Sequence, residues 1–274
     1  MIKIIDVDEL FDKYIEDYVM QNVGKVKPEE IENKIPLLYA EFGDKKFEEL
    51  AGATPNTFYR GYSSNELLEC LKTHLEKGVA VSDFLCEALR DTSEKEMAKE
   101  LEKELPEEYA LYLMNILGEV GSSLAVNRYL DFVLLDYSDN LREVATEMLY
   151  PFSDLVKERM LNNFEDAKKE VKDCLIDVFS HASHDDRILK ILLDEFKQNK
   201  KNISLNSAYL SKYGDERALP VLLEAIEDEK ISYADFEELR FAIESLGGEY
   251  TKERDFSNDS NYKKLNNAKN IKIM

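Results

Sequence analysis

The chain has 274 residues, with 36 Lys and Arg against 57 Asp and Glu, which gives a net charge of −21. This negative average field repels nucleic acids and anionic membranes and attracts basic proteins, so we expect no nucleic-acid and no membrane partner. Hydrophobic residues make up 44% of the chain, enough for a buried core, whereas only 10 Gly and 6 Pro are present to form turns. These proportions exclude a wholly disordered chain and favour helices over an all-β domain.

The cysteine content and the N-terminal sequence indicate the compartment. Cys70, Cys86 and Cys174 are sparse, odd in number and set in apolar periodic stretches, which predicts buried thiols in a reducing compartment. The first residues, MIKIIDVDELFDKY, lack a basic region followed by a long apolar core. No stretch approaches the roughly 20 apolar residues of a membrane span. We therefore expect a cytoplasmic protein.

Residues 1–105 are predicted to form an N-terminal helical region that matches no repeat. Asp6, with Glu9 three residues later, has the spacing of a capping box, which predicts the start of the first helix. A second helix is expected from about Pro28, because proline suits the first turn of a helix. Pro36 lies inside the same apolar pattern, so we expect a kink or a break there.

The clearest loop of this region is GATPNTFYRGY, residues 52–62. It carries Phe58, Tyr59, Arg60 and Tyr62, and aromatic residues and arginine are enriched in binding hot spots. A loop that packs its own aromatic side chains onto the helices is the commoner arrangement and is the interpretation we favour. A binding loop stays an alternative.

From Tyr109 the apolar pattern becomes regular. Helices are expected over residues 107–118, 123–136, 140–150, 153–165, 168–181, 184–198, 203–213, 215–228 and 232–246. The connections between them are short, which in an all-α chain implies antiparallel neighbours. The tail, residues 249–274, is rich in Asn and Lys and is expected to be loosely held.

Four apolar segments within this region align with one another. They are LAVNRYLDFVLL from Leu124, LVKERMLNNF from Leu155, RILKILLDEF from Arg187 and RALPVLLEAI from Arg217. Matching positions are separated by 31, 32 and 30 residues and are occupied by Leu130, Leu161, Leu193 and Leu223. A period near 31 accommodates two short helices and two turns, and such pairs must stack to bury their apolar faces.

The fourth segment lies in the stretch YLSKYGDERALPVLLEAIEDE. Gly214 can end a helix in the left-handed conformation, Asp215 can cap the next helix, and Pro220 falls in its first turns. Together with Arg217, these residues resemble a HEAT-like repeat of the short type found in phycobilisome-lyase-like proteins. The three earlier segments keep the spacing but lack the Gly-Asp and the Pro.

The resemblance implies an α-α superhelix, a HEAT-like solenoid, over residues 106–248, preceded by the N-terminal helical region 1–105 and followed by the tail 249–274. The all-α class itself follows from the periodic pattern and the scarcity of turn residues. An irregular helical bundle is the alternative to the solenoid, because helical bundles in general give similar apolar periods.

One cluster has the residue types of a metal site. His181 and His184 lie in SHASHDD, beside Asp185 and Asp186. Two imidazoles and nearby carboxylates suit a transition metal, but three convergent ligands are needed. Because the segment is expected at a helix junction, where Ser, His and Asp act as caps, we predict no metal and no cofactor.

Cys70 and His74 have the spacing of a catalytic dyad. Four residues apart on a helix, they share one face. Cys70 also lies among leucines that favour an inward position, and no third residue to orient the histidine is evident. We therefore predict no catalytic residue and no enzymatic activity.

HEAT-like proteins generally bind other proteins, so the resemblance implies a protein-binding or scaffolding module whose partner is a protein or peptide, preferably basic. Two other classes stay open. One is an immunity-type inhibitor that masks a basic toxin. The other is an enzyme of the HEAT-like lyase type.

The best-matching unit also predicts a binding face. Four apolar side chains of its second helix are expected to point inward: Leu219, Leu222, Leu223 and Ile226. Position 224 then points away from the core. Carried back through the register, it gives a mostly acidic ladder of Asp131, Asn162, Asp194 and Glu224, flanked one turn earlier by Glu158 and Lys190. The resemblance implies that second helices line the concave surface, where such a ladder would suit a basic helix or peptide. The alternative is a solvated acidic face without a partner.

Overall fold

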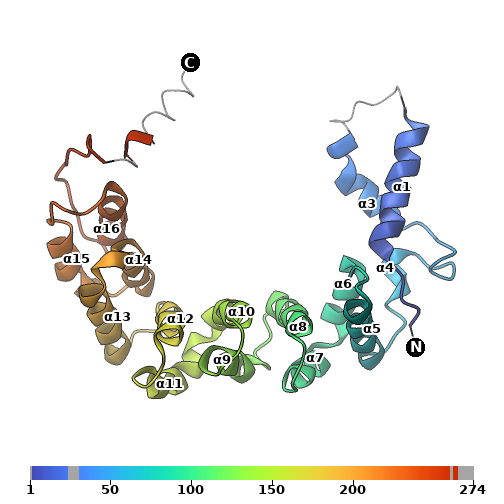
Figure 1. The fold of residues 1–274 in the computed structure, drawn as a ribbon, viewed down its shortest axis with the longest axis horizontal. Coiled ribbons are helices and arrows are strands. Elements are labelled where there is room, and N and C mark those ends of the chain that lie inside the picture. The colour runs from blue at the N-terminus through green and yellow to red at the C-terminus, as the bar shows by residue number, and fades with distance from the viewer. Residues whose placement is uncertain (1, 24–30, 260–261, 265–274) are drawn as a thin grey trace. The chain divides into compact units, whose positions relative to one another are not determined.

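A computed structural model describes residues 2–23, 31–259 and 262–264 of the chain. Every regular element in these ranges is a helix and none is a strand, so the all-α class is confirmed (Figure 1). The chain divides into two compact units, Met1–Arg128 and Tyr129–Met274, here called unit 1 and unit 2. The division after residue 105, which was inferred from the repeat pattern, stays a prediction.

Unit 1 contains one short and several longer helices. They are α1 (Val7–Gln21), α3 (Ile35–Gly43), α4 (Pro55–Phe58), α5 (Ser64–Lys77), α6 (Asp83–Thr92), α7 (Glu94–Leu101) and α8 (Glu107–Glu119). Helix α1 packs against α3, α5 against α6, and α7 against α8. Helix α9 (Val126–Leu134) crosses the boundary between the units.

Two local predictions for unit 1 are confirmed. The carboxylate of Asp6 caps α1 by accepting a hydrogen bond of 2.8 Å from the backbone N–H of Glu9. Pro36 is the second residue of α3, so the predicted break occurs just before it, where a missing N–H costs little. Pro28 lies outside the part of the chain that the structure describes.

Unit 2 contains most of the helices of the region in which the apolar pattern recurs about every 31 residues. They are α10 (Asp139–Leu149), α11 (Ser153–Phe164), α12 (Lys169–Phe179), α13 (Asp186–Gln198), α14 (Ile203–Tyr213), α15 (Leu219–Ala225) and α16 (Tyr233–Ser245). Short 3-10 turns lead into α11, α14 and α15, over Tyr150–Phe152, Lys200–Asn202 and Glu216–Ala218. In the regions that the structure resolves, no helix is both long and apolar enough to cross a membrane.

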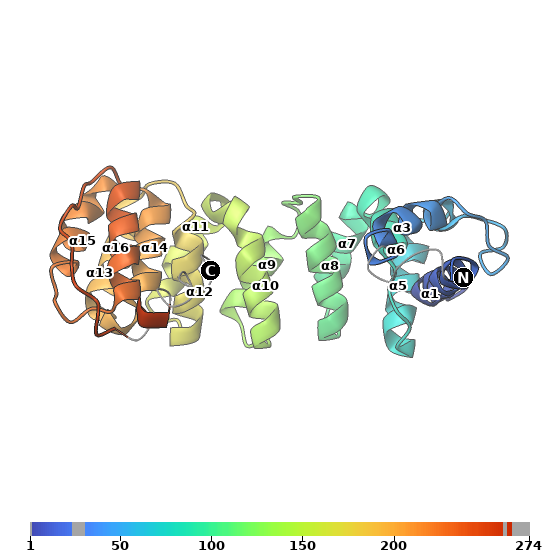
Figure 2. The ribbon, with the colours of Figure 1, turned by 90° about the horizontal axis from the view of Figure 1, so that it is seen from above.

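The helices of unit 2 fall into two layers (Figures 1 and 2). Helices α10, α12, α14 and α16 lie side by side in one layer, and α11, α13 and α15 lie in the other. Within the first layer α10 packs on α12, α12 on α14, and α14 on α16, whereas helices of the second layer pack mainly on the first. Because the first layer is the more closely spaced, it lies on the inner side of unit 2.

The turn between α14 and α15 has the predicted conformation. Gly214 ends α14 with a φ of +75°, in the left-handed region that glycine favours. The carboxylate of Asp215 accepts a 3.0 Å hydrogen bond from the backbone N–H of Arg217, and Pro220 is the second residue of α15.

Ion pairs link successive helices of the second layer of unit 2. The guanidinium of Arg187 donates to Glu158 at 2.6 Å, and that of Arg217 donates to Asp186 at 2.6 Å. The two arginines are 30 residues apart in the sequence and each reaches back to the preceding helix of its layer. The sequence period is therefore also the period of these side-chain contacts.

One predicted core position is wrong. Leu223 was expected to point inward, but its side chain is 37% exposed. Leu222 and Ile226 are fully buried and lie one turn apart, so they define the centre of the inward face of α15. Successive helical residues are about 100° apart, and Leu223 therefore turns toward solvent. At the matching positions Leu130 is buried, whereas Leu161 and Leu193 are half-buried.

The described part of the tail is tied to the end of α15. The guanidinium of Arg254 donates hydrogen bonds of 2.7 Å to the carbonyl oxygens of Ile226 and Asp228. Lys252 forms an ion pair of 2.6 Å with Glu227. These contacts involve residues before 260.

Candidate functional site

An open groove of about 470 Å³ lies on the inner layer of unit 2, between α10 and α12 and next to α14. We call it the acidic groove. Its lining residues are Asp139, Arg142, Glu143, Thr146, Glu147, Tyr150, Glu170, Asp173, Cys174, Asp177 and Tyr209. Six of these carry a carboxylate and one carries a positive charge. Figures 1 and 2 show the three helices side by side.

The carboxylates form one row on each helix. Asp139, Glu143 and Glu147 follow one another at every fourth residue along α10, and Glu170, Asp173 and Asp177 follow at three and four residues along α12. Residues at these spacings lie on one face of a helix. Because α10 packs against α12, the two rows line the same groove.

The single cation of the lining, Arg142, is already engaged. Its guanidinium donates to Asp139 at 2.6 Å and to the carbonyl oxygen of Tyr137 at 3.2 Å. Its side chain is only 12% exposed, and its Nε is buried without a hydrogen-bond partner in the described regions. Arg142 therefore compensates the charge of Asp139 at one end of the groove.

Four carboxylates of the groove form no ion pair with any residue that the structure describes. They are Glu143, Glu147, Glu170 and Asp173. Burial raises the pKa of Asp173, Lys169 opposes this shift, and the negative charges of Glu195 and Glu170 add to it. A carboxylate with a raised pKa is one whose charge is poorly compensated.

The other end of the groove closes on Asp177. One of its oxygens accepts a 2.7 Å hydrogen bond from the hydroxyl of Tyr150. Its other oxygen is buried, accepts no hydrogen bond in the described structure and lies 3.9 Å from the ammonium nitrogen of Lys212. Burial is the main cause that raises the pKa of Tyr150 well above its usual range, and the hydrogen bond to Asp177 raises it further. This phenol therefore stays neutral.

The same end holds His181. Its ring stacks on Tyr150 with centroids 3.9 Å apart and planes 9° from parallel. Lys212 donates to its Nε2 at 3.1 Å and lies 5.6 Å from the centroid of the Tyr150 ring. Burial and the positive charge of Lys212 lower the pKa of His181, so the neutral imidazole can accept this hydrogen bond. The groove thus ends at a position occupied by a cation of the chain itself.

The predicted acidic ladder lies on different helices. Asp131, Asn162, Asp194 and Glu224 are carried by α9, α11, α13 and α15. The expectation that such helices line the concave side is wrong for α11, α13 and α15, because within unit 2 the closer-spaced layer is the α10–α16 layer. The layer whose helices are closer together lies on the inner side of unit 2. The sequence period does not tell which of the two layers this is.

The charges of the ladder are also partly compensated. Asp131 is half-buried and forms an ion pair with Arg159, and Glu158 is paired with Arg187. Asp194 is half-buried, whereas Asn162, Lys190 and Glu224 are exposed. A role of these residues in binding stays a prediction.

The two histidines considered as metal ligands turn to different partners. They lie between α12 and α13, at the helix junction that the sequence predicted. The Nε2 of His184 is 3.1 Å from the carbonyl oxygen of Tyr213, and its Nδ1 is 3.9 Å from Asp215, whereas His181 faces Lys212. Among the described residues, no group of three His, Cys, Asp or Glu side chains is arranged to hold a metal.

Cys70 and His74 share one face of α5, as expected, but both are buried. The Nδ1 of His74 lies 2.8 Å from the carbonyl oxygen of Ala80, which fixes the ring. Burial raises the pKa of the Cys70 thiol to about 11, so the nucleophilic thiolate is scarce at neutral pH. This environment does not suit nucleophilic catalysis.

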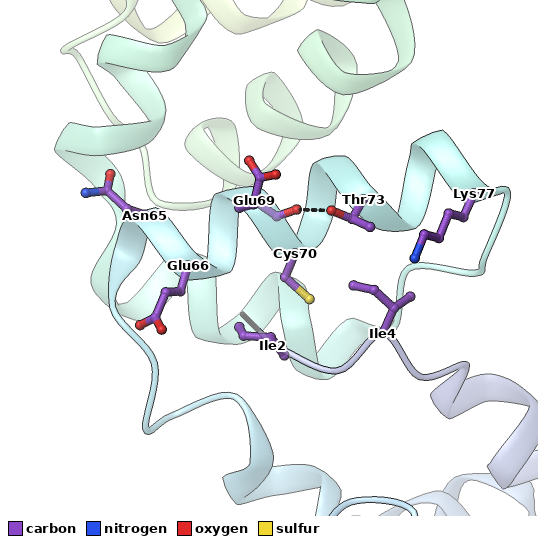
Figure 3. A pocket seen from close by; sticks show the side chains of 8 residues that line it. All are labelled: Ile2, Ile4, Asn65, Glu66, Glu69, Cys70, Thr73 and Lys77. Atoms are coloured by element: carbon purple, nitrogen blue, oxygen red, sulfur yellow. Dashed lines mark hydrogen bonds between the residues drawn. The ribbon is translucent and has the colours of Figure 1, made fainter.

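Cys70 borders a second hollow, of about 440 Å³, in unit 1 (Figure 3). Its thiol points between Ile2 and Ile4 of the N-terminal segment, with Glu66 toward one end and Lys77 toward the other. Ligand sites combine apolar walls with polar groups that converge on one point. Here Glu66 and Lys77, two of the three charged side chains of the lining, lie at opposite ends, so the acidic groove is the stronger candidate.

The segment 52–62, which the sequence predicts to be a loop, contains the short helix α4 and packs its own aromatic side chains. Phe58 and Tyr59 are buried, and their rings meet edge to face with centroids 4.9 Å apart. Arg60 is exposed. The interpretation favoured from the sequence is confirmed for these two aromatic residues, since neither can contact a partner without moving.

The apolar periods of the sequence do not single out the residues of the acidic groove. A signal for them exists, because the three acidic residues of α10 recur in α12 after 31, 30 and 30 residues, which is the repeat period. Asp139 matches Glu170, Glu143 matches Asp173, and Glu147 matches Asp177. An alignment that includes polar as well as apolar residues at the repeat period identifies the acidic rows of α10 and α12.

Comparisons with known proteins do not extend this picture. No protein-family model matches the chain, and a search of curated proteins found no match. The function is therefore inferred from the residues of the groove and their surroundings.

Proposed function

We propose that the chain is a non-enzymatic protein-binding module built on HEAT-like repeats, and that its acidic groove holds a basic segment of a protein partner. The observation that carries this proposal is the set of four groove carboxylates without an ion pair in the described structure. Like charges gathered in one groove repel one another, and a cationic ligand relieves that repulsion.

The protonation states in the groove favour binding over catalysis. Burial raises the pKa of the Cys174 thiol, and it raises those of Tyr150 and Tyr209 well above the usual range of a phenol. These groups are neutral at physiological pH, so none is an activated nucleophile or general base. As neutral walls they can pack against the aliphatic stems of lysine or arginine.

The negative charge of the groove would mainly raise the rate at which a basic partner associates. A groove lined by one sign of charge attracts an opposite charge over about a Debye length, roughly 8 Å at physiological ionic strength. Complementary charges raise the association rate and exclude acidic competitors more than they raise affinity. Binding should therefore weaken steeply as salt is added.

A labelled nonalysine peptide provides the first test. In the variant Glu143→Lys with Glu147→Lys, two groove carboxylates become cations. We expect about 10-fold weaker binding, a loss of about 1.4 kcal/mol, because two attractions become repulsions. Fluorescence anisotropy at 50 and 150 mM salt measures the affinity.

The matched control is Glu216→Lys with Glu229→Lys, which changes the net charge equally at two exposed positions outside the groove. Its affinity should stay within about twofold of that of the unmodified chain. Equal losses in the two double variants would show that nonalysine responds to the average charge of the chain, and the groove would lose its role.

A further inference from the structure

Helix α16, the last helix of unit 2 in the described part of the chain, exposes an aromatic ring. The side chain of Phe241 is 63% exposed, whereas Leu239 and Ile243 of the same helix are fully buried. Phe241 borders a shallow hollow of about 370 Å³. The other residues that line this hollow are Glu237, Glu238, Arg240 and Glu244. The surface is therefore an apolar ring surrounded by charged side chains, and we call it the Phe241 surface.

The charges of the Phe241 surface leave a negative excess. The guanidinium of Arg240 pairs with Glu237 at 2.7 Å and lies 3.9 Å from Glu244. Glu238 is exposed as well, so three carboxylates share one cation in the lining. Such a surface is complementary to a segment that combines apolar side chains with positive charges.

The described part of the tail already packs at one end of this surface. The backbone N–H of Tyr233, the first residue of α16, donates a 3.2 Å hydrogen bond to the carboxylate of Asp259. The ring of Tyr262 meets that of Tyr233 edge to face, with centroids 5.0 Å apart. Tyr233, Glu237 and Phe241 follow one another at every fourth residue, so they are neighbours along α16. The tail thus arrives where the Phe241 surface begins.

The sequence that follows Tyr262 has the chemistry that this surface needs. Residues 263–274, KKLNNAKNIKIM, contain four lysines, four large apolar side chains and no acidic residue. The distance to cover is short, because the eight residues from Tyr233 to Phe241 correspond to about 12 Å along α16. Ten extended residues span up to about 33 Å. A segment tethered by a short linker has an effective concentration in the millimolar range, so a contact too weak for a free peptide can still form.

We propose that residues 265–274 dock on the Phe241 surface of their own chain, with apolar side chains on the ring of Phe241 and with Lys269 and Lys272 beside the carboxylates. This contact continues the one between Tyr262 and Tyr233 along α16. It goes beyond the proposed function, because it does not involve the acidic groove. A docked tail would also exclude other basic segments from this end of unit 2.

A single fluorophore tests the contact, because the chain contains no tryptophan. Phe241→Trp places an indole at the centre of the surface, and it is examined in the full chain and in a chain that ends at Lys264. We expect acrylamide to quench the indole about threefold less in the full chain, with emission at a shorter wavelength, because a covered apolar surface is removed from water. Glu238→Trp provides a second reporter if Phe241→Trp fails to fold.

Two matched controls accompany this measurement. Leu155→Trp, on α11, is 70% exposed, and removal of residues 265–274 should leave its quenching unchanged. In the full chain with Phe241→Trp, Lys269→Glu with Lys272→Glu should raise quenching to the level of the shortened chain, because two attractions become repulsions. Lys200→Glu with Lys201→Glu makes the same change of charge at two exposed positions of unit 2 and should leave the protection intact.

Three results would overturn the proposal. Equal quenching of Phe241→Trp with and without residues 265–274 would show that the tail does not cover the ring. Equal effects of the two double lysine variants would show that the average charge of the chain, and not Lys269 and Lys272, is responsible. An intramolecular contact is independent of chain concentration between about 1 and 50 µM, so protection that grows over this range would show that the tail docks on a second copy.

Discussion

The ion pairs of Arg217 allow the loss of stability in the variant Arg217→Ala to be predicted. The guanidinium of Arg217 donates 2.6 Å hydrogen bonds to Asp186, on the preceding helix of its layer, and to Asp215. The two acceptors differ in environment, because the side chain of Asp186 is 85% exposed and that of Asp215 only 7% exposed. The substitution therefore breaks one solvated ion pair and leaves one nearly buried carboxylate without its cation.

The two losses have different sizes. An exposed pair contributes about 0.5 kcal/mol. A buried charged acceptor that loses its partner costs about 1–3 kcal/mol, and Asp215 keeps one hydrogen bond from the backbone N–H of residue 217. We therefore expect the free energy of unfolding to fall by about 1–2 kcal/mol in total. For a unit of this size that corresponds to a decrease in Tm of roughly 2–8 °C.

Arg240→Ala is the matched control. Arg240 is similarly exposed but pairs with Glu237 and Glu244 of its own helix, so its removal should cost no more than about 0.5 kcal/mol. Urea unfolding followed by far-ultraviolet circular dichroism measures both variants. Equal costs for Arg217→Ala and Arg240→Ala would refute the inference that the contacts of Arg217 with Asp186 and Asp215 stabilise unit 2 more than an ion pair within one helix does.

The cost of Arg217→Ala should also depend on pH. The hydrogen bonds and charge of Arg217 hold the pKa of Asp215 below its usual value in the folded chain. A depressed folded pKa contributes stability above the unfolded pKa, about 3.9, and that stability disappears as the pH falls through the folded pKa. The difference between the unmodified chain and Arg217→Ala should therefore be full at pH 7 and shrink as the pH falls below about 4. An equally large difference at pH 3 would contradict this electrostatic origin.

Two further predictions test burial and backbone conformation. Cys70 is 3% exposed and burial raises its pKa to about 11, so iodoacetamide at pH 8 should label it only in urea; mass spectrometry that finds rapid labelling of the folded chain would disprove its burial. Gly214→Ala should lower the free energy of unfolding by about 1 kcal/mol because φ is +75° at this residue, whereas Gly61→Ala, with open space around the added Cβ and no left-handed backbone, should stay within about 0.5 kcal/mol in the same urea titration.

The helices of this chain could be predicted from the sequence because their signals are local. A helix was expected over residues 140–150 and the structure has α10 at Asp139–Leu149; one expected over residues 203–213 coincides with α14. Apolar periodicity, capping side chains and Gly214 act within a few residues of the helix that they define. Such signals need no knowledge of what packs against the helix.

Helix α15 shows where local signals fail. A helix was expected over residues 215–228, but α15 spans only Leu219–Ala225 and follows a 3-10 turn at Glu216–Ala218. Asp215 caps this 3-10 turn, and α15 begins one residue before Pro220. Leu222 and Ile226 are fully buried and Leu223 is 37% exposed, so Leu223, which the sequence also predicts to point inward, lies at the edge of the inward face. The apolar pattern alone could not tell which of the neighbouring residues Leu222 and Leu223 lies at the centre of this face.

The acidic groove was missed for a different reason. The repeat period identifies equivalent residues, but it does not tell which of the two layers is the more closely spaced. That spacing depends on the side chains packed between neighbouring helices, and it places the α10, α12, α14 and α16 layer on the inner side of unit 2. The apolar alignment followed the other layer, so it led to Asp131 and Glu224. The acidic residues that recur at the same period on α10 and α12 carry the additional information. An acidic position that repeats on neighbouring helices of one layer brings like charges together, and four of these six carboxylates form no ion pair with a residue that the structure describes.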